Sequence, residues 1–263
     1  MTSIVRFFLL VAYLSPLFVL AQSGAASEKG YEIQLTVKPY ANQKLYLGYH
    51  YGKLKYLLDS VVLNQQHTGK LSGLKALPGG IYFVVSPQRQ ILFELLIDKP
   101  QHFALVADST GGFQNIQFTN SPDNQQFQSY TQFIGKRGRD LQLAQQALKD
   151  SKSPKDSAER AQQVKKLNDE INQYRSQVSA KDPQRILPSI FRAMQEPEVP
   201  PAAQHPGGKY DSLFAYRYYK DHYWDGVSFQ DERLVRTPLF EQKLDKYYKE
   251  LVTPVPDSII LEV

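Results

Sequence analysis

Asp221, His222 and Asp225 stand close together in the sequence, and such a grouping could supply a metal ligand or a general base. A metal site needs several ligands at set spacings, and no second histidine lies one helical turn from His222. The remaining histidines are isolated along the chain: His50, His67, His102 and His205. We therefore interpret His222 as a structural or solvated residue and expect no metal site.

Two acidic and two basic residues follow shortly afterwards. Asp231 and Glu232 could form a carboxylate pair for acid/base catalysis, but adjacent side chains on a helix diverge. Arg233 and Arg236 lie within a turn or two, and a guanidinium between carboxylates suits a partly buried ion-pair network. We expect salt bridges here, and our hypothesis is that both arginines hold the loop after Trp224 onto the surrounding helices.

The rest of the chain offers no catalytic constellation. Cysteine is absent from all 263 residues, which excludes disulfides, thiolate metal sites and thiol catalysis. Asp59-Ser60 has no partner signature, and no Gly-x-Ser-x-Gly elbow is present. Gly79-Gly80 and Gly111-Gly112 lack the spacing of a phosphate-binding loop and indicate turns. We expect no catalytic residue, no cofactor and no enzyme activity.

Aromatic residues are dense between positions 210 and 224. They are too many for one helix face, so some must be exposed or packed against another element: Tyr210, Phe214, Tyr216, Tyr218, Tyr219, Tyr223 and Trp224. Exposed aromatics would favour a partner surface or a saccharide platform, and buried ones would pack across a helical half of the chain. Our candidates for a structural or interaction role are His222, Trp224, Asp225, Asp231, Glu232, Arg233 and Arg236.

The first residues have the pattern of an export signal. Arg6 supplies a positive start, an apolar run follows over 7–20, and Val19-Leu20-Ala21 suits a signal peptidase. The run is short for a membrane span, so we predict a cleaved signal peptide over 1–21 and a mature chain from Gln22, with an uncleaved anchor as the alternative. We expect the protein in the periplasm or cell envelope, without a stable membrane span after cleavage.

Short apolar stretches separated by turn residues occupy positions 29–120, after a small, polar and flexible leader over 22–28. From Tyr31 to Val37 every second residue is apolar, which is the period of a strand with one buried face. Pro78-Gly79-Gly80 indicates a turn, because glycine tolerates positive φ. The spacing predicts an antiparallel β-sandwich-like domain, and an α+β chain overall because helices follow.

From position 121 to 263 the apolar period becomes that of helices, which predicts an all-helical domain. A hydroxyl that can accept from free amides, followed by Pro, marks three expected helix starts: Ser121-Pro122, Ser153-Pro154 and Thr237-Pro238. We predict an antiparallel helical hairpin and then three shorter helices, at about 122–179, 183–195, 210–223 and 238–252. The Pro-rich stretch 196–208 should form a loop.

The formal charge of +5 is scattered along the helical stretches rather than gathered with aromatic residues. A nucleic-acid-binding protein should have a basic face, so we interpret the excess as a solvated surface and expect no nucleic-acid partner. Hydrophobic residues make up 42% of the chain, which is enough apolar surface for packed cores.

Both halves resemble known domain families. The second half resembles a helical domain of unknown function that lies just before a thioredoxin-like module in secreted proteins of some Gram-negative bacteria. The residues that carry this resemblance are His222-Tyr223-Trp224-Asp225, 231–240, Tyr247-Tyr248 and 256–260. The first half resembles the β-rich domain of unknown function at the start of the same proteins, through Leu58-Asp59-Ser60-Val61, Gly79-Gly80-Ile81-Tyr82, Phe93 to Asp98 and Asn120-Ser121-Pro122-Asp123-Asn124.

This chain departs from that family at its end. In the family a thioredoxin-like module, of the thiol-disulfide oxidoreductase or peroxiredoxin-like kind, follows with a Cys pair. Here the chain ends at Val263, after Asp257 has capped what looks like a new helix that is cut short. The redox activity that the family implies is therefore carried over to no residue here. A truncated gene product, a fragment and a stand-alone accessory version all remain open.

Two functions of different class follow from these observations. The first is a non-catalytic exported accessory or interaction module, with a protein partner in the cell envelope, that positions a redox partner or a substrate. The alternative is a periplasmic ligand-binding protein that holds a saccharide or peptide at the sandwich edge or on the aromatic residues. An enzyme in its own right ranks third.

Overall fold

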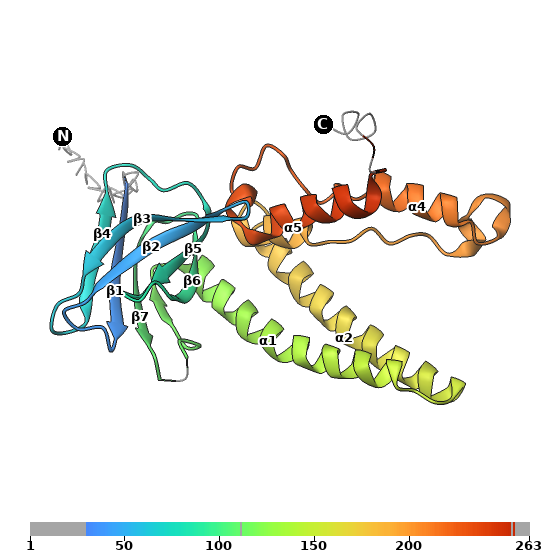
Figure 1. The fold of residues 1–263 in the computed structure, drawn as a ribbon, viewed down its shortest axis with the longest axis horizontal. Helices are drawn as coiled ribbons and strands as arrows, with labels where there is room; N and C mark the ends of the chain where they lie inside the picture. The colour runs from blue at the N-terminus through green and yellow to red at the C-terminus, as the bar shows by residue number, and fades with distance from the viewer. Residues whose placement is uncertain (1–29, 111, 254, 256–263) are drawn as a thin grey trace, which may run out of the picture.

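The protein is a mixed α+β chain in which the strands come first and gather at one end, and the helices extend away from them (Figure 1). The described residues of the computed structural model are 30–110, 112–253 and 255. The expected signal peptide and leader, over 1–28, and the helix after Asp257 lie outside them. No described helix combines the length and the apolar character that a membrane span requires.

Among the described residues, eight strands form two four-stranded sheets. The first sheet has the order β4-β1-β7-β8, and the second has the order β3-β2-β5-β6. The strands are β1 Tyr31–Lys38, β2 Lys44–Tyr51, β3 Leu54–Val62, β4 Thr68–Gly73, β5 Gly80–Val85, β6 Ile91–Ile97, β7 His102–Asp108 and β8 Gln117–Thr119. In β1 every second side chain from Tyr31 to Val37 is buried, as the sequence period predicts.

The neighbours β1 and β7 run parallel, whereas we expected antiparallel strands throughout. Glu32 pairs with His102, and Lys38 pairs with Asp108. All four strands of the second sheet lie between β1 and β7 in the chain, so the chain can return to the same end of β1 before it forms β7. Alternation along a strand shows which side chains are buried, but it does not fix the direction of the neighbouring strand.

Strand β5 lies where two hydrophobic cores meet. All of its residues are buried, and the adjacent Ile81 and Tyr82 belong to different cores. Tyr82 and Val84 pack in a core built from both sheets, whereas Ile81 joins Leu96 of β6 and helical residues such as Phe191. Successive side chains of a strand point to opposite faces of its sheet. One face of the second sheet therefore packs in the core shared with the first sheet, and part of its other face packs on the helices.

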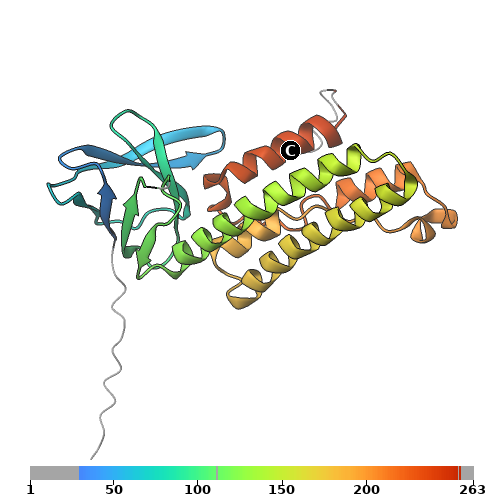
Figure 2. The ribbon, with the colours of Figure 1, turned by 90° about the horizontal axis from the view of Figure 1, so that it is seen from below.

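The helices are α1 Pro122–Lys149, α2 Pro154–Lys181, α3 Ile186–Ala193, α4 Ser212–Asp221 and α5 Pro238–Lys246, and α5 continues as a wider turn over Tyr247–Leu251. Helices α1 and α2 lie side by side and antiparallel (Figures 1 and 2). Leu167, Ile171 and Val178 of α2 are buried. Tyr174 stacks on Phe133 of α1 with ring centroids 4.4 Å apart. The apolar stripes on both helices thus form a packing interface.

Each of the three expected helix starts precedes a helix, but only one hydroxyl caps it. Ser153 Oγ accepts from the backbone N–H of Asp156 at 3.2 Å. The Ser121 hydroxyl makes no such bond and accepts from the side chain of Asn124 instead, and Thr237 donates to a carbonyl of the preceding turn. Proline at the first position located these helices, while the other two hydroxyls bond to groups three residues away instead of to the free amides of the helix.

Helix α3 begins at Ile186 and not at position 183 as expected. Pro188 lacks an N–H and is tolerated in the first helical turn, where the N–H groups have no partner within the helix. A start at Ile186 keeps Pro188 in that turn. The N–H of Ile186 is bound at 2.9 Å by Oδ2 of Asp98, the residue after β6. A distant residue therefore caps this helix, and local sequence could not reveal it.

A buried asparagine joins α1 to strand β6. Asn124 is 1% exposed, its Oδ1 accepts from the backbone N–H of Leu96 at 2.7 Å, and its Nδ2 donates to the Leu96 carbonyl at 2.8 Å. The side-chain amide therefore pairs with the free edge of β6 much as the peptide group of another strand would.

We predict that Asn124→Ala lowers the free energy of unfolding by about 2–4 kcal/mol, because two buried backbone groups lose their partners. Urea denaturation measures this change. Asn172→Ala, at an exposed position of α2, is the matched control and should change stability by less than about 0.5 kcal/mol. Equal stability of the two variants would show that the Asn124 amide does not hold the two elements together.

Candidate functional site

Arg233, in the segment between α4 and α5, joins several distant parts of the chain. Its Nε and Nη2 donate to the two carboxylate oxygens of Asp231, each at 2.7 Å. Its Nη1 donates at 3.0 Å both to Asp98 Oδ2 and to the Gln184 carbonyl, and Nη2 reaches Ser189 Oγ at 3.3 Å. A planar guanidinium allows this forked geometry, which the single ammonium of lysine could not reproduce.

The two carboxylates of this network are largely shielded from water. The side chain of Asp98 is 11% exposed, and that of Asp231 is 14% exposed. The hydrogen bonds from Arg233 hold the pKa of Asp231 below its ordinary value, and they raise the pKa of Arg233 in turn. Our hypothesis named only helices as the partners of this arginine. The structure adds Asp98 at the end of a strand, which no sequence pattern had indicated.

Gly79 and Gly80 allow the same segment to touch the start of β5. A Cβ on Gly80 would lie 2.5 Å from the Cβ of Arg236, and one on Gly79 would lie 2.6 Å from the Cγ of Arg233. Neither glycine has a positive φ, so our expectation that they provide such a conformation was wrong. They are needed because the 3₁₀ turn Leu234–Arg236 passes directly against their backbone.

Arg236 and Glu232 take little part in the ion pairing. Nη1 of Arg236 donates to the Glu232 carbonyl at 3.0 Å, and the guanidinium lies 5.8 Å from the ring centroid of Tyr51 on β2. The Glu232 side chain is exposed, whereas Asp231 turns inward to Arg233. The two adjacent carboxylates therefore point to different environments, and the pair is not arranged for acid/base catalysis.

Trp224 belongs to a second buried group, which we call the aromatic cluster and which consists of Tyr219, Tyr223, Trp224, Tyr247, Tyr248, Leu251 and Val252. Trp224 lies perpendicular to Tyr223 with ring centroids 5.0 Å apart, and it lies 5.2 Å from Tyr247. Tyr223 is 1% exposed. By contrast, Tyr210, Tyr216 and Phe229 are exposed. The aromatic residues of this region are therefore divided between packing and surface.

Lys243 is buried beneath the aromatic cluster, with 6% of the residue exposed. Its Nζ lies 4.0 Å from the ring centroid of Tyr223 and 5.8 Å from that of Trp224, and it donates to the Gln195 carbonyl at 3.4 Å. Burial lowers the pKa of Lys243, although the charge of Glu196 opposes this shift. Loss of hydration therefore outweighs the attraction that the ammonium finds in this environment.

The side chains of His222 and Asp225 lie within hydrogen-bond distance of each other at the surface. Nδ1 of His222 lies 2.7 Å from Oδ2 of Asp225, and the two side chains are 43% and 68% exposed. Such an exposed pair contributes little to stability. In the part of the chain that the structure describes, no three His, Asp or Glu residues are grouped so that they could hold a metal ion.

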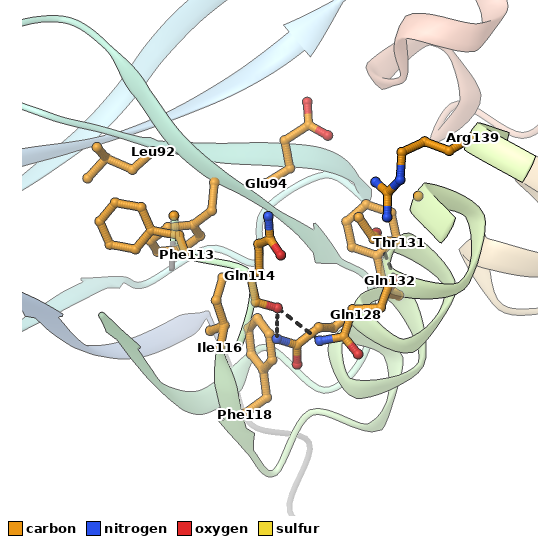
Figure 3. A pocket seen from close by; sticks show the side chains of 14 residues that line it. Leu92, Glu94, Phe113, Gln114, Ile116, Phe118, Gln128, Thr131, Gln132 and Arg139 are labelled. Atoms are coloured by element: carbon orange, nitrogen blue, oxygen red, sulfur yellow. Dashed lines mark hydrogen bonds between the residues drawn. The ribbon is translucent and has the colours of Figure 1, made fainter. Parts of the chain in front are cut away.

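Two cavities lie close to these elements. A polar one of about 320 Å³ is lined by Arg233 together with Ser189, Arg192 and Asp231 among others. A larger and more apolar one of about 470 Å³ lies between β6, the segment 112–118 and α1 (Figure 3). Because its lining comes from separate segments, no local pattern could have revealed it.

Two residues that line the larger cavity lower the stability of the local backbone. Phe113 has a φ of 59°, a conformation that costs a bulky residue about 1–3 kcal/mol. Gly135 lies inside α1, where glycine costs about 1 kcal/mol relative to alanine, and a Cβ there would meet nothing within 4 Å. A glycine inside a helix is visible in the sequence alone, so Gly135 is a local signal for this site.

Residues 152–261 match the family described as Domain of unknown function (DUF5106). The matched part begins just before α2 and extends beyond α5, so it excludes the strands and α1. It contains every predicted structural or interaction residue: His222, Trp224, Asp225, Asp231, Glu232, Arg233 and Arg236. A search of curated proteins gave no match. The aromatic cluster lies wholly within the matched part, whereas the Arg233 network also reaches out of it to Asp98.

We predict that Arg233→Met lowers the free energy of unfolding by about 2–4 kcal/mol, because two shielded carboxylates lose their charged partner. In a double-mutant cycle with Asp98→Asn, the combined loss should be smaller than the sum of the single losses by about 1 kcal/mol or more. Arg217→Met, at an exposed position of α4, serves as the control and should change stability little. An unchanged melting temperature for Arg233→Met would refute the tethering role.

For Lys243→Met we predict a protein that is more stable at pH 7 by about 1–2 kcal/mol, because a buried charge is replaced by an apolar side chain of similar size. Since the pKa of Lys243 is lowered on folding, the unfolded chain binds more protons between that lowered value and the ordinary one of 10.5. The stability of the parent protein should therefore rise with pH in this window, and the advantage of the variant should shrink.

Thermal unfolding at several pH values measures this difference. Lys249→Met, at an exposed position near the end of the same helical stretch, should show no comparable gain at pH 7. A loss of stability in Lys243→Met at pH 7 would mean that the attraction between the ammonium and the aromatic rings exceeds the cost of burial.

Proposed function

We propose that this chain is a non-catalytic accessory module of the periplasm or cell envelope, and that it acts by binding a protein partner. Its resemblance to the N-terminal region of thioredoxin-like envelope proteins supports this role, as does the export signal that the sequence predicts over 1–21. We further propose that the two sheets form a sandwich-like domain over 29–120 and that 121–263 form a helical one. The core shared by both sheets supports this division.

The observation that carries the proposal is the exposed edge of β3. This strand ends its sheet and pairs within it with β2 on one side. Its large apolar residues are between 43% and 63% exposed, namely Leu54, Tyr56, Leu57, Leu58 and Val62. Edge strands of soluble proteins are usually protected by charges or by covering elements, and an apolar one is a template for another strand.

The geometry of β3 favours a partner with an extended, apolar segment. Leu47 pairs with Asp59 and Gly48 with Leu57, so Leu58 forms a bulge that interrupts the regular edge. The bulge restricts regular pairing to short stretches, of which 54–57 is next to the hairpin tip. At that tip Lys53 pairs with two carboxylates of α5, with Glu241 at 3.1 Å and with Asp245 at 2.9 Å. Main-chain hydrogen bonds would supply affinity, and the exposed side chains would supply selectivity.

We predict that Leu57→Lys abolishes partner binding without unfolding the protein, since a charge on an exposed edge opposes strand addition and changes stability by about 0.5 kcal/mol or less. A photo-crosslinking amino acid at position 54, used in intact cells, should give a discrete adduct that falls at least about tenfold in the Leu57→Lys background.

The matched control is Leu143→Lys, because Leu143 is an exposed apolar residue on α1, with 71% of its surface accessible. This change should leave the adduct unaffected. The proposal fails if position 54 gives no adduct, or if the adduct is as abundant with Leu57→Lys as without it.

A further inference from the structure

The larger cavity lies where the core shared by the two sheets meets the helical core. Phe93 and Phe118 belong to the core shared by the sheets, and Phe127 packs on the helical core. The volume of about 470 Å³ falls in the range of small-molecule sites. The apolar side chains in the lining are Leu92, Phe93, Phe113, Ile116, Phe118 and Phe127. An apolar ligand body would displace water from these rings, and that transfer is favourable.

Hydrogen bonds attach the cavity wall formed by 112–118 to α1. The Gln114 carbonyl accepts from Nε2 of Gln128 at 3.2 Å and from Nε2 of Gln132 at 2.9 Å, as the dashed lines in Figure 3 show. Gln132 also donates to Asn115 Oδ1 at 3.1 Å. These bonds hold Phe113 in its left-handed conformation against the cavity. Strained residues that the surroundings hold in place occur preferentially at ligand sites.

Gly135 and Arg139 form the α1 side of the cavity mouth. They are four residues apart and therefore lie on the same face of the helix. A helical side chain leans toward the helix N-terminus, so Arg139 extends over the turn that contains Gly135. Because Gly135 carries no side chain, the space below the guanidinium stays open.

The guanidinium of Arg139 supplies a cation at the mouth of the cavity. Glu94 also lines the cavity, but its Oε1 lies 3.1 Å from Nε2 of His50, and Figure 3 shows its carboxylate turned away from the aromatic wall. Asp140 pairs with Arg137 at 3.3 Å, and no carboxylate among the described residues pairs with Arg139. The site therefore combines apolar walls with one guanidinium that has no carboxylate partner in the described part of the chain, and the planar fork of a guanidinium matches the geometry of a carboxylate.

We infer that this cavity binds an amphipathic carboxylate, with an aliphatic or aromatic body against the phenyl rings and the carboxylate group at Arg139. This site is separate from the β3 edge, and the inference does not depend on the proposed binding of a protein partner.

Calorimetric titration of the purified full chain with decanoate and with decan-1-ol tests the inference. Both share the same apolar chain, but only decanoate carries the charge. The parent protein should bind decanoate more tightly than decanol. Arg139→Gln should weaken decanoate binding at least about tenfold and decanol binding less than about twofold, because only the carboxylate loses a partner. Absence of decanoate binding to the parent protein, or equal losses for both ligands in Arg139→Gln, would overturn the inference.

Gly135→Leu and Gly138→Leu give a matched pair for the location of the site. Both replace a helix-weakening glycine of α1 where a Cβ would meet nothing within 4 Å, so both variants should fold. Only Gly135 lines the cavity, so Gly135→Leu should abolish binding of both ligands while Gly138→Leu retains it. Retained binding in Gly135→Leu would place the ligand elsewhere and overturn the assignment. Leu57→Lys should bind decanoate like the parent, which separates this test from that of the β3 edge.

Discussion

The guanidinium of Arg233 connects the end of a strand, the start of a helix and the segment that leads into α5. Its partner Asp98 does two things with one oxygen, because Oδ2 accepts both from Arg233 and from the first N–H of α3. Carboxylates that are so shielded would be costly without this charge beside them. The position of α3, and of the 3₁₀ turn Leu234–Arg236 on β5, therefore depends on one side chain that the surrounding backbone accommodates.

The helices cover only part of the second sheet. The helices cover its face near Ile81 and Leu96, where the helical core begins. At one edge of the sheet, β3 exposes apolar side chains to solvent. At the opposite edge, Asn124 closes β6 at Leu96, while Phe93 and its neighbours line the cavity. Both proposed binding surfaces thus lie at edges of one sheet.

The sequence predicts where the strands and helices of this protein lie better than it predicts which elements they contact. Alternation in β1 and proline at the helix starts are local signals, and the corresponding strand and helices are present where those signals lie. The parallel pairing of β1 with β7 and the cap that Asp98 gives to α3 join residues far apart in the chain, so no local period contains them. Gly79 and Gly80 show the same limit, because the residues that require them, Arg233 and Arg236, lie in another element.

In the candidate site, too, contacts between residues close in the sequence can be predicted, and contacts between distant residues cannot. Salt bridging by Asp231 could be predicted, since its arginine is two residues away, but the second carboxylate could not. The division of the aromatic residues between cluster and surface also depends on where α5 lies, which the sequence of α4 does not contain. The walls of the larger cavity come from several segments of the chain, and Gly135 is the lining residue that local sequence makes conspicuous.

Features that oppose stability do not by themselves indicate function, and this protein offers a comparison. Lys243 is buried at an energetic cost, yet aromatic rings and backbone enclose its ammonium, so no ligand could reach it without opening the core. Phe113 and Gly135 also oppose local stability, but they line an open space with a cation at its mouth. Selection for stability alone would favour alanine at Gly135, because nothing there would clash with a methyl group. Accessibility, and not strain, is therefore the property that separates a candidate binding site from a structural compromise.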